Sequence, residues 1–362
     1  EKLPTFLLAS VLMLMAYSFL RFGVAGIFFN KHGLTVISTL PLISRLINIP
    51  KIIYFYLQTY LWPQNLAINQ QWVVKTINFA DFYLPLIIGL LFFGVLVYFG
   101  IKLFRKNKDM SRLYLFFFLW FILGLGLHLQ IFPLDLTVSD RWFYLPQVGL
   151  LGMMGVLTIK QSDNRTMAKA IKIITIIIII FLSFRTVVRT FDWRNGYTLY
   201  SHDVKISQDA FDLENNLGVE LFRIEQYEQA KVHFEKSIRL SPKWWTSYNN
   251  LGAYYERKNN LEKAAELYKI SIKNGNYYLA YENLAFVLLK EKKYQESIKF
   301  LEKNLPFFPY NIKLNLAMVL AYYQNGDTEK ALVYAQRLYQ LSPTQDNAQL
   351  INTIINQQPL GL

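Results

Sequence analysis

Asp140 and Arg141 are the residues of this sequence best placed to do chemistry, because two ionisable side chains stand where a long apolar stretch begins. Ionisable groups at a membrane boundary are costly unless they pair with each other or face water or a lipid headgroup. Two interpretations stay open: the two residues pair, or Arg141 binds a lipid-linked phosphate through bidentate hydrogen bonds. Tyr144 lies one helical turn beyond Arg141, so its hydroxyl could face the same phosphate.

His128 is a weaker candidate for the same site. It lies near the outer end of the preceding apolar stretch, where an interhelical hydrogen bond is the main expectation and a ligand role is the alternative. The candidates for contact with a lipid phosphate are therefore Arg141, Tyr144, Asp140 and His128. The sequence identifies no catalytic residue and no metal-ligand cluster, and it has no cysteine for thiolate chemistry or disulfides.

Apolar stretches long enough to cross a membrane surround this segment, since a span needs about 20 apolar residues. A fifth, weaker stretch qualifies because its flanking basic side chains can reach the two interfaces. The expected spans are residues 3–20, 82–104, 113–131, 142–159 and 171–188.

Residues 43–62 are apolar but interrupted by Arg45, Pro50 and Lys51. A re-entrant or interfacial helix is therefore at least as well supported there as a full span. The chain begins Glu1-Lys2-Leu3 and runs at once into an apolar stretch without a signal-peptide cleavage pattern. We therefore expect a piece of a longer protein.

The net charge of +13 belongs almost entirely to the first half of the chain. Residues 1–189 contain 18 Lys and Arg against 6 Asp and Glu, and the remainder contains 20 against 19. Lys and Arg gather in the cytoplasmic loops of membrane proteins, so topology accounts for the charge and no nucleic-acid partner is expected. The two most basic loops carry Arg105, Lys106, Lys108 and Arg112, and Lys160, Arg165, Lys169 and Lys172.

These loops orient the membrane half. If both face the cytoplasm, residues 132–141 lie on the opposite side, and the last span carries everything after about Arg189 to that side as well. The expected localisation is a multi-pass membrane protein whose second half is extracytoplasmic.

The second half repeats with a period of about 34 residues, which is the length of a tetratricopeptide repeat. Asn216-Leu217-Gly218 recurs as Asn250-Leu251-Gly252 and as Asn283-Leu284-Ala285. Small residues at Gly218 and Ala230 let two antiparallel helices approach, and a proline such as Pro242 ends the second helix. The predicted fold class is all-α: a polytopic membrane domain over residues 1–190, a linker helix over 191–210, four tetratricopeptide repeats over 211–343, and a capping helix and tail over 344–362.

Stacked repeats form a superhelix whose concave face is built from the first helix of each unit. A protein or peptide partner is the expected ligand of that face. The candidate groove residues in this register are Asn215, Val219, Phe222, Asn249, Glu256, Glu282, Phe286 and Tyr323.

Three segments of the membrane half resemble a known family. Residues 139–146 read Ser-Asp-Arg-Trp-Phe-Tyr-Leu-Pro, residues 189–194 read Arg-Thr-Phe-Asp-Trp-Arg, and residues 61–66 read Leu-Trp-Pro-Gln-Asn-Leu. With the repeats that follow, this order resembles the C-terminal part of the transmembrane and tetratricopeptide-repeat O-mannosyltransferases and their prokaryotic relatives, which belong to the GT-C superfamily. The family segment usually reads Glu-Arg-Tyr-x-Tyr-x-Pro or a close variant. Here Asp140-Arg141-Trp142 stands for its start, and Tyr144 and Pro146 match.

The resemblance implies transfer of a sugar from a polyprenyl-phosphate donor to an acceptor on the non-cytoplasmic face. It also implies an acidic catalytic residue in an N-terminal outer loop that this chain does not contain, and a divalent metal ion could act only through that part. We do not expect Asp81, Asp135 or Asp140 to take over that role, so this chain alone is expected to be inactive.

Two alternatives differ in kind. The first is a non-enzymatic, membrane-anchored repeat scaffold for protein assembly in the cell envelope. The second is an O-antigen-ligase-like enzyme with appended repeats. That class needs a large outer loop carrying Arg and His, and residues 132–141 are too short for it.

Overall fold

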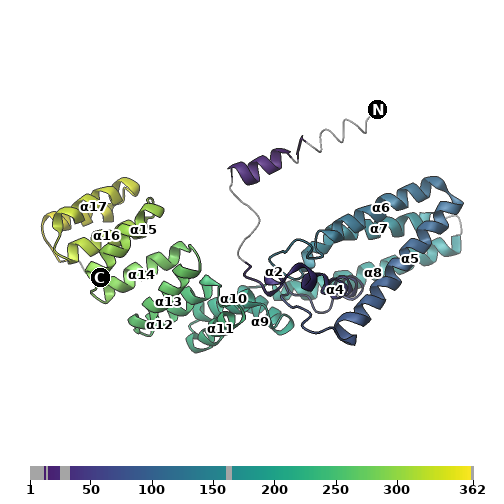
Figure 1. The fold of residues 1–362 in the computed structure, drawn as a ribbon, viewed down its shortest axis with the longest axis horizontal. Coiled ribbons are helices and arrows are strands. Elements are labelled where there is room, and N and C mark those ends of the chain that lie inside the picture. The colour runs from purple at the N-terminus through teal and green to yellow at the C-terminus, as the bar shows by residue number, and fades with distance from the viewer. Residues whose placement is uncertain (1–11, 14, 25–32, 160–164, 360–362) are drawn as a thin grey trace.

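Helices supply the regular structure of this chain in the computed structural model. The structure describes residues 12, 13, 15–24, 33–159 and 165–359. Within these residues the β pairing consists of one isolated antiparallel bridge, between Gln70 and Val138. The membrane half and the repeat array lie end to end (Figure 1).

The membrane half is built from short helices followed by long apolar ones. The short elements are a π-helix (Phe19–Val24), α2 (Val36–Thr39), α3 (Leu42–Leu46), α4 (Ile49–Leu61) and a second π-helix (Phe79–Tyr83). The long ones are α5 (Leu84–Lys106), α6 (Lys108–Gly126), α7 (Tyr144–Ile159), which a 3₁₀ turn (Asp140–Phe143) precedes, and α8 (Arg165–Asp192).

Among the described residues, four helices are long and apolar enough to cross a membrane, by length and composition: Phe79–Lys106, Lys108–Gly126, Asp140–Ile159 and Arg165–Asp192. They coincide with four of the five stretches expected from the sequence, although α6 ends at Gly126, five residues before the expected end. The expected span over residues 3–20 falls largely outside the described residues. Residues 43–62 are broken into α3 and α4 and are not among the candidate spans.

The basic turn between α5 and α6 lies at the end of the membrane half far from the repeats (Figure 1). Asn107 caps α6 at this turn, accepting hydrogen bonds from the backbone N–H groups of Asp109 and Met110. The repeats therefore lie at the opposite end of the candidate spans from Arg105, Lys106 and Lys108.

The helix α7 packs closely on α6 because two of its glycines leave room. A Cβ atom added at Gly149 would lie 2.7 Å from Phe117 O and Phe121 N, and the ring of Phe117 fills the space beside Gly152. Gly155, which continues the same spacing, faces open space. The small residues thus bring the two helices together over about one turn of α7.

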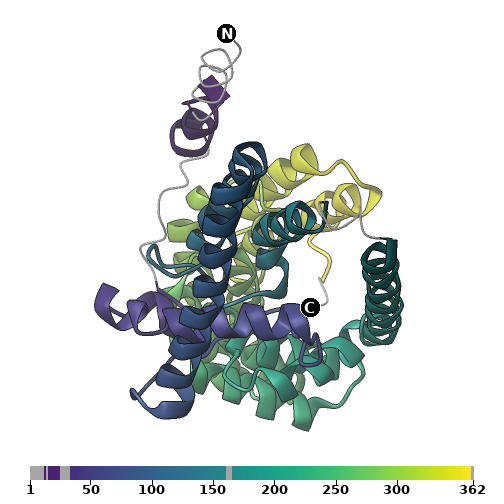
Figure 2. The same cartoon turned by 90° about the vertical axis from the view of Figure 1, so that its right-hand side faces the viewer.

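In contrast, α8 stands apart from α5, α6 and α7 (Figure 2), and none of its apolar window is buried. It is held by contacts toward its C-terminal end. Trp62 stacks on Phe181 with ring centroids 5.1 Å apart, and the guanidinium of Arg185 donates to the carbonyls of Pro63 and Gln64.

The repeat half consists of α9 followed by four antiparallel helix pairs and a final helix, which confirms the all-α repeat architecture. The bounds are α9 (Gly196–Ile206), α10 (Phe211–Arg223), α11 (Tyr227–Leu240), α12 (Trp245–Arg257), α13 (Leu261–Asn274), α14 (Tyr278–Lys290), α15 (Tyr294–Asn304), α16 (Ile312–Gln324), α17 (Thr328–Leu341) and α18 (Gln345–Ile355).

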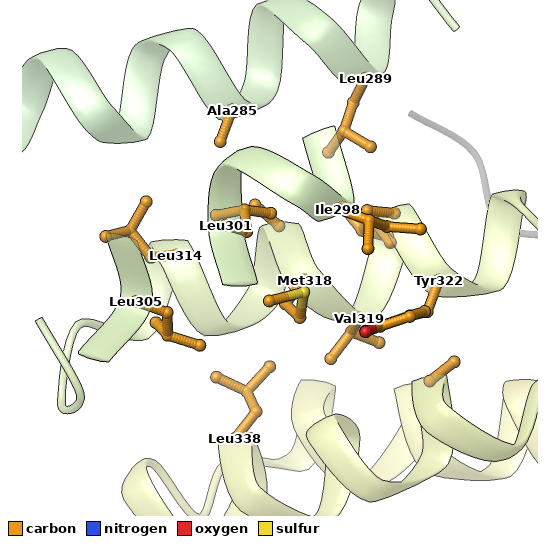
Figure 3. Close-up of a cluster of buried hydrophobic side chains, with 14 of the residues drawn as sticks. Ala285, Leu289, Ile298, Leu301, Leu305, Leu314, Met318, Val319, Tyr322 and Leu338 are labelled. Carbon is orange, nitrogen blue, oxygen red and sulfur yellow. The ribbon is translucent and has the colours of Figure 1, made fainter. Parts of the chain in front are cut away.

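Close approach within each pair follows from the small residues that the repeat pattern places there. The ring of Phe234 would lie 2.6 Å from a Cβ atom at Gly218, and Tyr268 lies equally close to one at Gly252. Larger side chains fill the space between the later pairs, where Leu301, Leu314 and Met318 converge (Figure 3). The core therefore runs from one repeat into the next, as stacking requires.

The turn inside each pair uses a left-handed residue at the same repeat position. Glu225, Asn259 and Lys292 have φ of 63°, 59° and 59°, and Gly326 has φ of 87°. In each case the next backbone N–H closes a bond to the carbonyl five residues earlier, as from Gln226 to Leu221 at 2.9 Å. The fourth turn alone uses glycine, which adopts this conformation without strain.

Candidate functional site

The 3₁₀ turn over Asp140–Phe143 separates the two charged residues that the sequence places side by side. A 3₁₀ helix has three residues per turn, so residues three apart lie on the same side. Asp140 and Phe143 point inward, where Phe143 stacks on Tyr56 with ring centroids 5.1 Å apart. Arg141 and Tyr144 point outward and are exposed, Tyr144 at 71%.

Asp140 and Arg141 do not pair with each other, although both lie in the described part of the chain. Asp140 accepts a hydrogen bond from the backbone N–H of Ala67 and lies near Arg189 and Asp203. The guanidinium of Arg141 makes no hydrogen bond or ion pair with any described residue, and its backbone carbonyl accepts from the N–H of Tyr144. A guanidinium without an internal partner at the end of a candidate span is free to bind an anion.

His128 packs against the same turn, in an arrangement that does not favour phosphate binding. Its ring stacks on Trp142, with centroids 5.2 Å apart and planes 13° from parallel. Burial lowers the pKa of His128, so the imidazole is neutral near neutral pH. Of the four phosphate candidates, the structure therefore brings Arg141 and Tyr144 together on one exposed face, and it places Asp140 and His128 against the protein.

An ionic cluster that sequence reasoning missed lies where α8 meets α9. Arg189 donates to Asp203 at 2.9 and 3.3 Å and to Asp192 at 3.0 Å. His202 lies 2.9 Å from the same Asp203 carboxylate. The side chain of Asp203 is fully buried. The i,i+3 spacing of Arg189 and Asp192 was visible in the sequence, but their partner on α9 was not.

The loop over residues 67–71 ties this cluster to the repeats. The backbone N–H of Ile68 donates to Asp203 at 2.8 Å. Asn69 and Gln71 donate from their side-chain amides to the two oxygens of Asp212, at 2.5 and 2.6 Å. Asp212 lies in the first turn of α10. The first repeat is thus bonded directly to the loop over residues 67–71.

On the concave face, three of the expected groove residues are buried and bonded to the next repeat. Asn215 accepts from Asn250 at 2.9 Å, Asn249 accepts from Asn283 at 3.0 Å, and Glu282 accepts from Asn311 at 2.8 Å. Their exposed fractions are 3%, 5% and 5%. Their hydrogen-bonding capacity therefore serves the stacking of repeats, and little of it remains for a ligand.

The other expected groove residues are partly exposed. Glu256 is bonded to Tyr268 and to Lys290, and Tyr323 donates to the backbone carbonyl of Gln358. Phe286 packs against the core of the last repeats. Val219 and Phe222 lie beside the core of the first repeats. The face available to a partner is therefore mainly apolar and aromatic.

Within the described residues, no group of three or more His, Asp or Glu side chains is arranged to hold a metal ion.

Comparisons with known proteins point to the repeats. Residues 215–243 match the model of the tetratricopeptide repeat. The chain is 26% identical over 140 residues to the protein O-mannosyl-transferase TMTC3 of Homo sapiens, a match covering 39% of this chain and 15% of that protein. It is 26% identical over 166 residues to the protein O-mannosyl-transferase Tmtc3 of Drosophila melanogaster, covering 45% and 18%.

A third relative and a solved structure are similar to part of the chain. The BBSome complex member BBS4 of Bos taurus is 28% identical over 136 residues, covering 37% of this chain and 26% of that protein. The crystal structure of YrrB, a tetratricopeptide-repeat protein with an unusual peptide-binding site, has a TM-score of 0.39 and 14% identity, covering 44% of this chain and 82% of that one. The matches to the two O-mannosyl-transferases cover less than a fifth of their lengths.

Proposed function

We propose that this chain is the C-terminal portion of a membrane glycosyltransferase that uses a polyprenyl-phosphate-linked sugar. In this proposal Arg141 binds the lipid phosphate, with Tyr144 beside it, on the extracytoplasmic face. The repeats, on the same side, hold a protein acceptor. The observation that carries the proposal is the exposed Arg141 guanidinium, which has no partner in the described chain and stands at the outer end of a candidate span.

The relatives support the proposal from the repeat side, since two of them are named O-mannosyl-transferases. The direct bonds between the 67–71 loop and α10 support it from the structural side. They hold the acceptor-binding array at a fixed place beside the lipid site, and a fixed geometry between two reactants lowers the barrier to their reaction.

The test is an Arg141→Ala variant of the full-length protein in nanodiscs. Binding of a polyprenyl phosphate should weaken by about 10- to 100-fold, as expected for loss of hydrogen bonds to a charged group worth roughly 1.5–3 kcal/mol. Sugar transfer should be lost while membrane insertion is retained. Arg141→Lys should restore part of the binding, because it keeps the charge and loses the bidentate geometry.

Arg194→Ala is the matched control, since Arg194 is also exposed and lies just beyond the outer end of α8. It should leave lipid binding and transfer unchanged. Wild-type binding and turnover in Arg141→Ala would remove the phosphate role. Absence of transfer in the wild-type protein with every donor would favour the scaffold alternative.

A further inference from the structure

A cavity of about 260 Å³ lies where the membrane half meets the first repeats. Its walls come from residues 33–38, from Gln71, from residues 133–136, and from Phe211, Asp212 and Trp244 of the repeat half. This volume is just below the roughly 300–1,000 Å³ of pockets that hold drug-sized ligands. The cavity therefore has the size for one side chain of a larger partner.

The described lining of the cavity carries negative charge. Asp135 and Asp212 both line it, and its described lining contains no Lys, Arg or His side chain. Asp212 is held by neutral amide donors from Asn69 and Gln71 and has no ion-pair partner among the described residues. Burial raises the pKa of Asp212, against the lowering effect of those amide hydrogen bonds. A partly buried carboxylate without a counter-charge is stabilised by a cation beside it.

Aromatic walls add to this preference. Phe211 and Trp244 both line the cavity and pack edge to face, with ring centroids 5.1 Å apart. A cation near an aromatic face gains roughly 0.5–2 kcal/mol from the ring quadrupole. The hydroxyls of Thr35 and Ser38 are bonded to each other and to a backbone carbonyl, so they add little to recognition.

Two polar atoms in the cavity walls lack partners among the described residues. Gln71 is 3% exposed and its Oε1 has no donor, and the indole Nε1 of Trp244 has no acceptor. A buried polar group left unpaired costs about 1–3 kcal/mol. Gln71 therefore keeps an acceptor, and Trp244 a donor, that no described side chain uses.

We propose that this cavity binds a lysine or arginine side chain of a polypeptide, with Asp135 and Asp212 contacting the cationic head and Trp244 and Phe211 packing against the stem. This inference rests on the proposed function in one respect: the polypeptide is taken to be the protein acceptor that the repeats hold. It adds a chemical preference: the bound segment carries a basic residue.

The experiment compares three fluorescently labelled dodecapeptides that differ only at a central position, which is lysine, Nε-acetyl-lysine or norleucine. Their dissociation constants for the full-length protein in nanodiscs are measured by anisotropy without any sugar donor. We expect the lysine peptide to bind at least 10-fold more tightly than the two neutral ones, and the difference should shrink as salt is raised.

Asp135→Asn is the main variant, because Asp135 lines the cavity, is exposed and makes no hydrogen bond or ion pair with a described residue. It should reduce the preference for lysine several-fold. Asp209→Asn, which changes an exposed acid outside the cavity, should leave it unchanged. Asp212→Asn should also reduce the preference, and its thermal unfolding is measured in parallel because Asp212 also holds the 67–71 loop.

Equal binding of the three peptides, no binding up to millimolar concentration, or a lysine preference that survives Asp135→Asn and Asp212→Asn would each overturn the assignment. Sugar transfer is measured in a separate assay that contains the donor. A lysine preference in the binding assay, together with no transfer in that second assay, would remove the proposed enzyme function and keep the cavity assignment. Sugar transfer without a lysine preference would keep the proposed enzyme function and remove the cavity assignment.

Discussion

Arg189 on α8 donates to both carboxylate oxygens of Asp203 on α9, at 2.9 and 3.3 Å. The side chain of Asp203 is fully buried, and its Oδ2 also accepts from the backbone N–H of Ile68. One carboxylate therefore joins α8, α9 and the loop over residues 67–71. This bond network fixes the direction in which the repeats leave the membrane half.

Replacing Asp203 by Asn should loosen that junction. Arg189 would keep a hydrogen-bond acceptor and lose its main counter-charge, and removing one partner of a buried pair costs about 3–5 kcal/mol. We expect faster tryptic cleavage at the exposed Arg194 and a lower unfolding temperature. Arg223→Ala, which removes a largely exposed partner of Glu220, should cost less than about 1 kcal/mol. Equal effects of the two variants would show that Asp203 does not hold the junction.

Gly149→Ala should disrupt the packing of α7 on α6. The added Cβ would lie 2.7 Å from two backbone atoms, Phe117 O and Phe121 N, which cannot move aside independently. Overpacking of this kind costs about 1–3 kcal/mol, so the melting temperature in detergent should fall. Gly155→Ala is the control on the same helix, because it meets nothing within 4 Å. A fall of the same size in both variants would contradict the close approach.

The stability of the repeats should decrease in acid through Glu214. Burial raises the pKa of this carboxyl, but hydrogen bonds and charge from His233 and Lys236 outweigh it, so the pKa lies below its ordinary value of 4.5. The folded state then binds fewer protons than the unfolded state. The stabilisation is therefore complete above the unfolded pKa and is lost as pH falls through the folded pKa.

Thermal unfolding of the protein in nanodiscs, followed between about pH 6 and 3, tests this effect. Glu214→Gln should lower the unfolding temperature near pH 6 and flatten its dependence below about pH 4.5. Glu329→Gln, at an exposed position, should leave the wild-type dependence in place. A Glu214→Gln profile parallel to that of the wild type would show that this carboxyl does not carry the acid sensitivity.

Protease added to the cytoplasmic side of sealed vesicles should cut the basic turn between α5 and α6 and spare the repeats. The expectation follows from the gathering of Arg105, Lys106 and Lys108 at the end of the candidate spans opposite the repeats. Western blotting with a tag after residue 359 measures protection, and detergent permeabilisation supplies the digestion control. Digestion of the repeats in intact vesicles would reverse the proposed topology.

The sequence alone determined the features that depend on neighbours along the chain. The 34-residue spacing of Leu217, Leu251 and Leu284 predicted the helix pairs, and runs of apolar residues predicted the four candidate spans that the structure contains. Both signals are local, since they arise from helix periodicity and from hydropathy over one segment. Even the turn positions followed the repeat, although only Asn259 and Gly326 are residue types that favour the left-handed conformation.

Tertiary structure decided which polar side chains have a hydrogen-bond or ion-pair partner within the protein and which do not. Adjacent in sequence, Asp140 and Arg141 are turned to opposite sides by a 3₁₀ turn whose inward side chain packs on Tyr56. The sequence predicted Asn215 and Asn249 as groove residues. In the structure their side-chain oxygens accept hydrogen bonds from the neighbouring repeat. The bond from Ile68 to Asp203 joins residues 135 positions apart. Such pairings depend on how separate helices pack, and no periodicity within one segment encodes that packing.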